Sequence, residues 1–126
     1  MSPDFTVQNQ PDSPMNVLCI CTAGEQRSPT AARLVRENYG HEARAAGVHP
    51  LAFQALTQRD IDWADVLLFM NEAEDRHHTI VSQNFSLGDK KAYVFDIPDI
   101  YPRDDPELAK ILSGKLNEIF SNPATE

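Results

Sequence analysis

The residues best suited to chemistry lie in one short segment, CTAGEQRS, which runs from Cys21 to Ser28. A thiolate is a strong nucleophile, and a guanidinium group six positions later, on Arg27, can hold two phosphate oxygens at once. The backbone N–H groups of such a loop can also surround an oxyanion at the start of a helix. The segment therefore predicts a phosphate-binding loop that begins with a nucleophilic thiol. Its predicted phosphate-binding residues are Thr22, Ala23, Gly24, Glu25, Gln26, Arg27 and Ser28.

This loop needs a strand before it and a helix after it to hold its shape. NVLCIC (16–21) is almost entirely apolar, which is typical of a strand covered on both faces. Ser28 and Pro29 favour a helix start, and Gly40 is a plausible stop. A buried structural thiol followed by an ordinary connecting loop is the alternative interpretation of Cys21.

The remaining pattern alternates strands with helices. Further strands are expected at 43–48, 65–70 and 92–97. Helices are expected at 71–83, where Asn71 and Glu74 have capping-box spacing, and from 105 to about 120. One or two helical turns are expected within 51–64, where Thr57 can act as a cap. This alternation predicts an α/β fold, a three-layer sandwich of a four-stranded parallel sheet with helices on both faces and the phosphate-binding loop after the first strand.

Several polar segments follow directly after the expected strands. Cys21, Gly47, Asn71 and Asp99 each lie at or just beyond a strand end. Because the carboxyl ends of parallel strands meet at one edge of a sheet, these residues are expected to lie together there.

Length and composition favour one ordinary domain. We expect a disordered N-terminal tail at 1–15, a single domain at 16–121 and a short C-terminal tail at 122–126. The net charge of −8 argues against generic nucleic-acid binding. No signal peptide or membrane span is recognisable, and two cysteines two positions apart favour reduced thiols and a cytoplasmic location.

Metal and cofactor sites are not indicated. His77 and His78 are adjacent, so on a helix they point in different directions, and no cluster of further ligands accompanies them. A solvated helix face is the expected place for both histidines.

The segment CTAGEQRSP, preceded by VLCI, resembles the signature of the low-molecular-weight protein tyrosine phosphatase family. ARAAGV, IDWADVLLFMNEAEDRH and DIPDIY resemble the family's second strand, third strand with its helix, and acid-bearing loop, so the likeness covers residues 16 to about 120. The chain is shorter than most relatives and is most similar to a short bacterial branch known mainly by prediction.

The resemblance implies hydrolysis of a phosphate monoester without a metal or other cofactor. Cys21 would form a cysteinyl-phosphate, and Arg27 would stabilise the transition states. Asp99 in the IPD triplet matches the general acid, although Asp96, Asp104 and Asp105 compete when the residues are considered alone. Glu25 and Tyr101 match positions that line the substrate cleft.

The chain departs from the family pattern inside the loop. Gly24 replaces the usual asparagine and Gln26 replaces a second cysteine, leaving Cys19 as the one other thiol that could protect Cys21. The expected substrate is a phosphorylated protein, as for a protein tyrosine phosphatase, or a small or nucleotide phosphomonoester, and the sequence does not indicate whether phosphotyrosine is preferred. A non-catalytic phosphate-binding module is the alternative function. An arsenate reductase of the same fold is disfavoured because downstream cysteines are absent. The sequence does not indicate an oligomeric state.

Overall fold

The computed structural model describes residues 14–23 and 25–120. The expected tails fall largely in 1–13 and 121–126, outside the described residues, as does Gly24. The elements are, in chain order, β1 (Asn16–Cys21), α1 (Arg27–Leu34), the π-helix η2 (Val35–Tyr39), β2 (Glu42–Gly47), α2 (Gln58–Trp63), β3 (Val66–Phe69), α3 (His77–Asn84), β4 (Lys91–Val94) and α4 (Pro106–Asn117).

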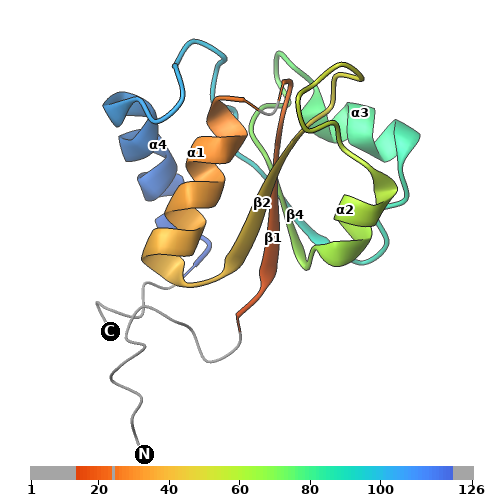
Figure 1. Cartoon of the computed structure of the whole chain (residues 1–126), viewed down its shortest axis with the longest axis horizontal. Helices are drawn as coiled ribbons and strands as arrows, with labels where there is room; N and C mark the ends of the chain where they lie inside the picture. Colours follow the sequence, from red (N-terminus) through yellow and green to blue (C-terminus); the bar gives the residue numbers. More distant parts are fainter. Residues whose placement is uncertain (1–13, 24, 121–126) are drawn as a thin grey trace, which may run out of the picture.

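The four strands form one parallel sheet in the order β2-β1-β3-β4. Helices α1 and α4 cover one face, and α2 and α3 cover the other (Figure 1). The predicted three-layer α/β fold is therefore confirmed. Strand β1 lies inside the sheet, paired with β2 and β3, which explains why nearly all of its residues are apolar.

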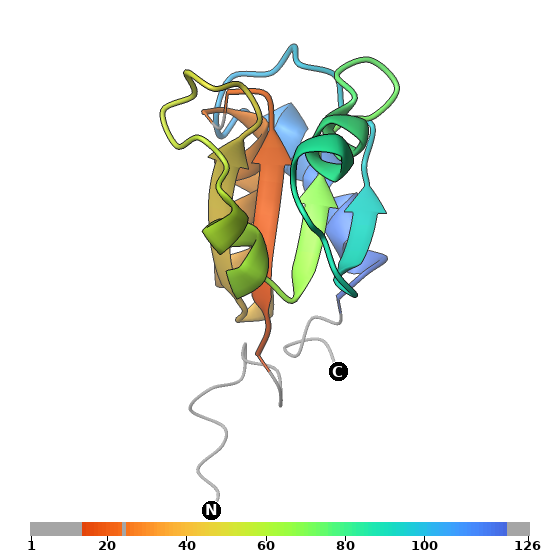
Figure 2. The same ribbon diagram turned by 90° about the vertical axis from the view of Figure 1, so that its right-hand side faces the viewer.

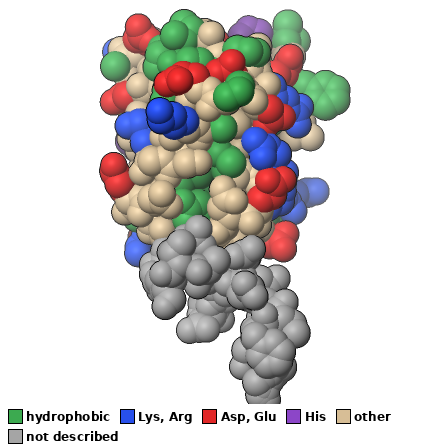
Figure 3. Space-filling model, turned by 90° about the vertical axis from the view of Figure 1, so that its left-hand side faces the viewer, with side chains coloured by type: hydrophobic (Ala, Val, Ile, Leu, Met, Phe, Trp, Pro, Cys, Tyr) green, Lys and Arg blue, Asp and Glu red, His purple; other side chains and the backbone are tan. Residues whose placement is uncertain are grey.

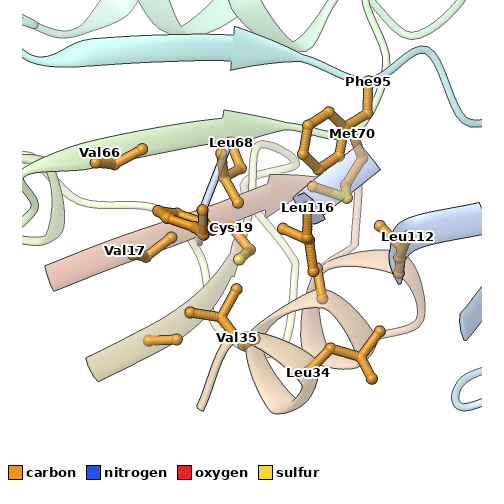
Figure 4. Close-up of a cluster of buried hydrophobic side chains, with 14 of the residues drawn as sticks. Val17, Cys19, Leu34, Val35, Val66, Leu68, Met70, Phe95, Leu112 and Leu116 are labelled. Atoms are coloured by element: carbon orange, nitrogen blue, oxygen red, sulfur yellow. The ribbon is translucent and has the colours of Figure 1, made fainter. Parts of the chain in front are cut away.

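Alternate residues of β1 face two separate cores. Val17, Cys19 and Cys21 pack toward α1 and α4, whereas Leu18 and Ile20 pack toward α2 and α3. Figure 4 shows Cys19 among the side chains of the first core. Cys19 is fully buried, and burial strongly raises the pKa of its thiol, so it remains protonated at neutral pH.

Two helix predictions need correction. The helix expected from residue 71 begins only at His77, because the side chain of Asn71 accepts hydrogen bonds from the N–H groups of Glu74 and Asp75 and so stabilises a turn. Ser28 is not the N-cap of α1: Gln26 occupies that position, and Ser28 is the second residue inside the helix.

Other helix boundaries follow the expected residues. Thr57 caps α2, as predicted, and it does so through a reciprocal capping box with Asp60. Gly40 ends the first helical segment with a φ of 74°, a conformation that glycine adopts without strain. Asp105 caps α4 and Pro106 occupies its first turn.

The described surface carries mixed charges. Acidic and basic side chains are interspersed over the side of the molecule that presents α1 and α4 (Figure 3). Among the described residues, no helix combines the length and apolar character that crossing a bilayer requires.

Candidate active site

The segments that follow the four strands gather at one end of the sheet, where all four strands point (Figure 2). At this edge, the N–H groups of Val48 and His49 donate hydrogen bonds of 2.9 and 3.0 Å to the carbonyl oxygens of Cys21 and Thr22. The chain after β2 therefore holds the first residues of the predicted phosphate-binding loop.

Gly47 makes this contact possible. A Cβ atom at Gly47 would lie 2.6 Å from the carbonyl carbon of Ala23 and 2.7 Å from the carbonyl oxygen of Thr22. Both atoms belong to the backbone, so they cannot move aside as the end of a flexible side chain would. The absence of a side chain at Gly47 is thus a structural requirement of the loop.

Cys21 ends β1 and is 3% exposed at the base of the loop. Its Sγ lies 3.0 Å from Oγ of Ser28, in the first turn of α1. A hydroxyl group in this position can donate a hydrogen bond to a thiolate and stabilise its negative charge. Ser28 thus contacts the sulfur instead of capping the helix.

Arg27 is 1% exposed and reaches across the same edge. Its Nη1 donates a 2.7 Å hydrogen bond to the carbonyl oxygen of Ile97, just after β4, and lies 2.9 Å from Oδ2 of Asp75. The contact with Asp75 is an ion pair without hydrogen-bond alignment, because Oδ2 has no hydrogen-bond partner among the described residues. Several elements therefore fix the guanidinium group.

The Nε atom of Arg27 is buried and has no hydrogen-bond partner among the described residues. Leaving a buried donor unsatisfied is costly, and such groups in native proteins usually have a reason. A charged donor at the start of a helix, beside the loop after a strand, suits a bound oxyanion.

Asp99 lies 3.7 Å from this Nε through its Oδ1 and is half exposed. The three competing carboxylates are engaged elsewhere: Asp96 accepts from the N–H groups of Glu72 and Ala73, Asp104 pairs with Arg33, and Asp105 caps α4. The hydrogen bonds to Asp96 also lower the pKa of its carboxyl group. Of these four carboxylates, Asp99 lies beside Arg27.

A buried histidine supports the loop from the other side. His77 is fully buried, so the prediction that it lies on a solvated face is wrong. Its Nδ1 accepts a 3.0 Å hydrogen bond from the N–H of Asn71, which leaves the ring proton on Nε2. That Nε2–H can donate to Oγ1 of Thr22, 2.9 Å away.

The charge state of His77 agrees with this arrangement. Burial, together with the nearby positive charge of Arg27, lowers the pKa of His77 to about 4, so the ring is neutral at pH 7. Asn71 also donates from Nδ2 to the carbonyl oxygen of Ile97, 3.3 Å away. The roles of His77 and Asp75 could not be inferred from their sequence positions, because both depend on the turn that Asn71 stabilises.

The other predicted residues are placed as follows. Ala23, Glu25 and Gln26 are exposed on the loop. Tyr101 is partly buried and packs against the core next to α1 and α4. A cavity of about 720 Å³ borders the loop at Thr22, between α3 and the segment after β2. Within 14–23 and 25–120, histidine, cysteine and acidic side chains form no group of three that could hold a metal ion.

Comparison with known proteins gives a likeness in structure. No family model matches the chain, and no curated protein sequence matches it. The tyrosine phosphatase Wzb from Escherichia coli K30, solved with phosphate, is 21% identical with a TM-score of 0.64, covering 85% of this chain and 99% of that chain. The low-molecular-weight protein tyrosine phosphatase from T. tengcongensis is 20% identical with a TM-score of 0.62, covering 83% and 99%.

A thioredoxin-dependent arsenate reductase from Corynebacterium glutamicum is also similar, at 20% identity and a TM-score of 0.57, covering 86% of this chain and 62% of that chain. Proteins of different activity thus share this architecture, and likenesses at such identities establish architecture alone. The chain has the fold of the low-molecular-weight protein tyrosine phosphatases.

Proposed function

We propose that this protein is a cysteine-dependent phosphatase of the low-molecular-weight protein tyrosine phosphatase type, which hydrolyses phosphate monoesters through a cysteinyl-phosphate. One observation carries the proposal. The thiol of Cys21 is paired with Ser28 at a strand-to-helix turn, beside a buried arginine whose Nε lacks a hydrogen-bond partner among the described residues. A nucleophile and an anion-binding group are thereby brought to one place.

In the first step, the thiolate of Cys21 attacks phosphorus, an S–P bond forms, and the P–O bond to the leaving group breaks. Asp99, half exposed at the rim, gives its proton to the departing oxygen. Arg27 and the loop N–H groups stabilise the negative charge on the other phosphate oxygens.

In the second step, a water molecule attacks the cysteinyl-phosphate while Asp99 takes up one of its protons. The S–P bond breaks, inorganic phosphate leaves, and the thiolate returns to its hydrogen bond with Ser28. Asp75 and Ile97 keep the guanidinium group of Arg27 in position throughout both steps.

The proposed substrate is a phosphorylated protein, and a small or nucleotide phosphate is the alternative. The likeness to an arsenate reductase favours one further candidate, because arsenate and phosphate have the same shape and charge. Reduction of arsenate would then need a second thiol besides Cys21, and Cys19 is buried in the core beneath the loop.

The test is hydrolysis of p-nitrophenyl phosphate in the presence of EDTA. We expect turnover by the wild type, inhibition by vanadate, loss of activity in Cys21→Ser and a large fall in kcat in Asp99→Asn. Cys19→Ala serves as the matched control and should keep the activity. Activity that survives Cys21→Ser, or that requires a divalent cation, would overturn the mechanism. Phosphate binding without turnover would favour a binding module, and thiol-dependent arsenate reduction would favour the reductase.

A further inference from the structure

A second cavity, of about 700 Å³, lies along the edge strand β2. Three arginines line it, Arg36 after α1, Arg44 on β2 and Arg103 in the loop before α4, together with the side chain of Phe53. We call these four residues and the cavity between them the basic groove. Its volume is within the range of ordinary binding pockets.

The charge of the basic groove is opposite to that of the whole chain. The protein has a net charge of −8, yet the lining contains three arginines and one carboxylate, that of Asp60. Asp60 lies 3.9 Å from Arg44, so it offsets only part of this local positive charge. A negatively charged ligand that avoids the rest of the surface is therefore attracted here.

Two of the arginines are held in place. Arg44 lies over the ring of Trp63, with its Cζ 4.0 Å from the ring centroid. Arg36 donates a 3.0 Å hydrogen bond from Nη1 to the carbonyl oxygen of Ala43 on β2. Little side-chain freedom is lost when such arginines bind a carboxylate, because they are already oriented.

Two segments that line the basic groove also carry residues of the proposed active site. Pro29, on its lining, directly follows the Ser28 that contacts Cys21. Arg103 belongs to the same connection between β4 and α4 as Asp99. A polypeptide with a phosphorylated residue at Cys21 can therefore continue into the basic groove, where Phe53, 82% exposed, offers an apolar contact.

We propose that the basic groove docks an acidic segment of a phosphorylated protein substrate, several residues from the phosphorylated side chain. This inference rests on the proposed phosphatase function and names its substrate class. Glu25, exposed on the phosphate-binding loop, disfavours acidic residues immediately next to the phosphorylated one. A peptide fits better than a nucleic acid, because the negative charge of the chain as a whole repels a long polyanion.

The test compares two phosphotyrosine peptides with p-nitrophenyl phosphate. One peptide carries three glutamates from the third residue onward on either side of the phosphotyrosine, and the other carries glutamines there. We expect the wild type to prefer the acidic peptide by about fivefold in kcat/KM, and 0.5 M NaCl to reduce this preference, since salt screens charges near the surface.

The variant Arg44→Gln/Arg103→Glu should lose that preference and keep its activity on p-nitrophenyl phosphate. Arg103→Glu alone, in an exposed loop, covers the case in which the double variant fails to fold. Lys110→Glu is the matched control for Arg103→Glu, because it makes the same change of charge on the exposed side of α4, away from the groove lining, and should behave as the wild type.

Binding is measured separately, by fluorescence anisotropy of the labelled acidic peptide without phosphate on the Cys21→Ser protein. If the wild type hydrolyses p-nitrophenyl phosphate but treats both peptides alike, the docking inference is wrong and the phosphatase proposal stands. If the wild type hydrolyses neither p-nitrophenyl phosphate nor the peptides, while the acidic peptide still binds through Arg44 and Arg103, the phosphatase proposal is wrong and the docking inference stands. If a single-stranded oligonucleotide binds as tightly as the acidic peptide at physiological salt, the inference of a peptide-specific site is wrong.

Discussion

Acidification should destabilise this protein through His77. The buried ring has a pKa of about 4 in the folded state against an ordinary value of 6.5. The unfolded chain therefore takes up the proton first as the pH falls, and the contribution of His77 to stability is complete above pH 6.5 and lost on the way to pH 4. The difference between 6.5 and about 4, at about 1.4 kcal/mol for each pH unit, corresponds to roughly 3–4 kcal/mol once both states are protonated.

The assay is urea unfolding at several pH values between 7 and 4, for the wild type and for His77→Gln. The carboxylates of Asp75, Asp99 and Glu72 lie near the ring, and burial also lowers the pKa of His41. They are present in both proteins, so the difference between the two curves isolates His77. We expect the variant to be less stable at pH 7 and to lose less stability on acidification.

His78→Gln is the matched control, because it removes the neighbouring imidazole, which lies edge-on to Phe69, and leaves the contact with Thr22 intact. A direct measurement is the titration of the His77 Cε1–Hε1 signal by NMR. A midpoint at 6.5 or above, or unfolding curves of the wild type and His77→Gln that fall in parallel, would refute the reasoning.

Three other variants test the support of the loop. Gly47→Ala should reduce kcat/KM on p-nitrophenyl phosphate at least tenfold and lower the free energy of unfolding by about 1–3 kcal/mol, because its Cβ would overlap backbone atoms of the loop. Gly114→Ala is its control: this residue lies inside α4 with open space around it, so the change should be neutral or stabilising. Asp75→Asn should lower the free energy of unfolding by about 1–3 kcal/mol, because Arg27 is left with less compensating charge. Added phosphate should then raise the Tm of this variant more than that of the wild type, and an equal rise would contradict the assigned ion pair. Ser28→Ala should lower kcat about tenfold through loss of the hydrogen bond to the sulfur, and a kcat like that of the wild type would show that the contact is only structural.

Much of the fold was predictable because its elements have strong local patterns. The strand before Cys21 is apolar on both faces, and the α4 segment repeats apolar residues at helical spacing. Capping of α2 by Thr57 was predictable for the same reason, since the capping box is formed within four consecutive residues. The helix expected from Asn71 was wrong because an asparagine after a strand can stabilise a turn as readily as a helix.

The sequence alone determined the chemical candidates at the site, because the spacing of Cys21, Arg27 and Ser28 is local and lies where a strand meets a helix. Only the tertiary structure decided which distant groups surround them. Asp75, His77 and Ile97 are 48 to 70 positions from the loop residues that they contact, and they meet those residues because parallel strands bring their carboxyl ends to one edge. The contact of Asp99 with Arg27, which supports the proposal of Asp99 as the general acid, has the same origin, since it depends on sheet order, which no short segment encodes.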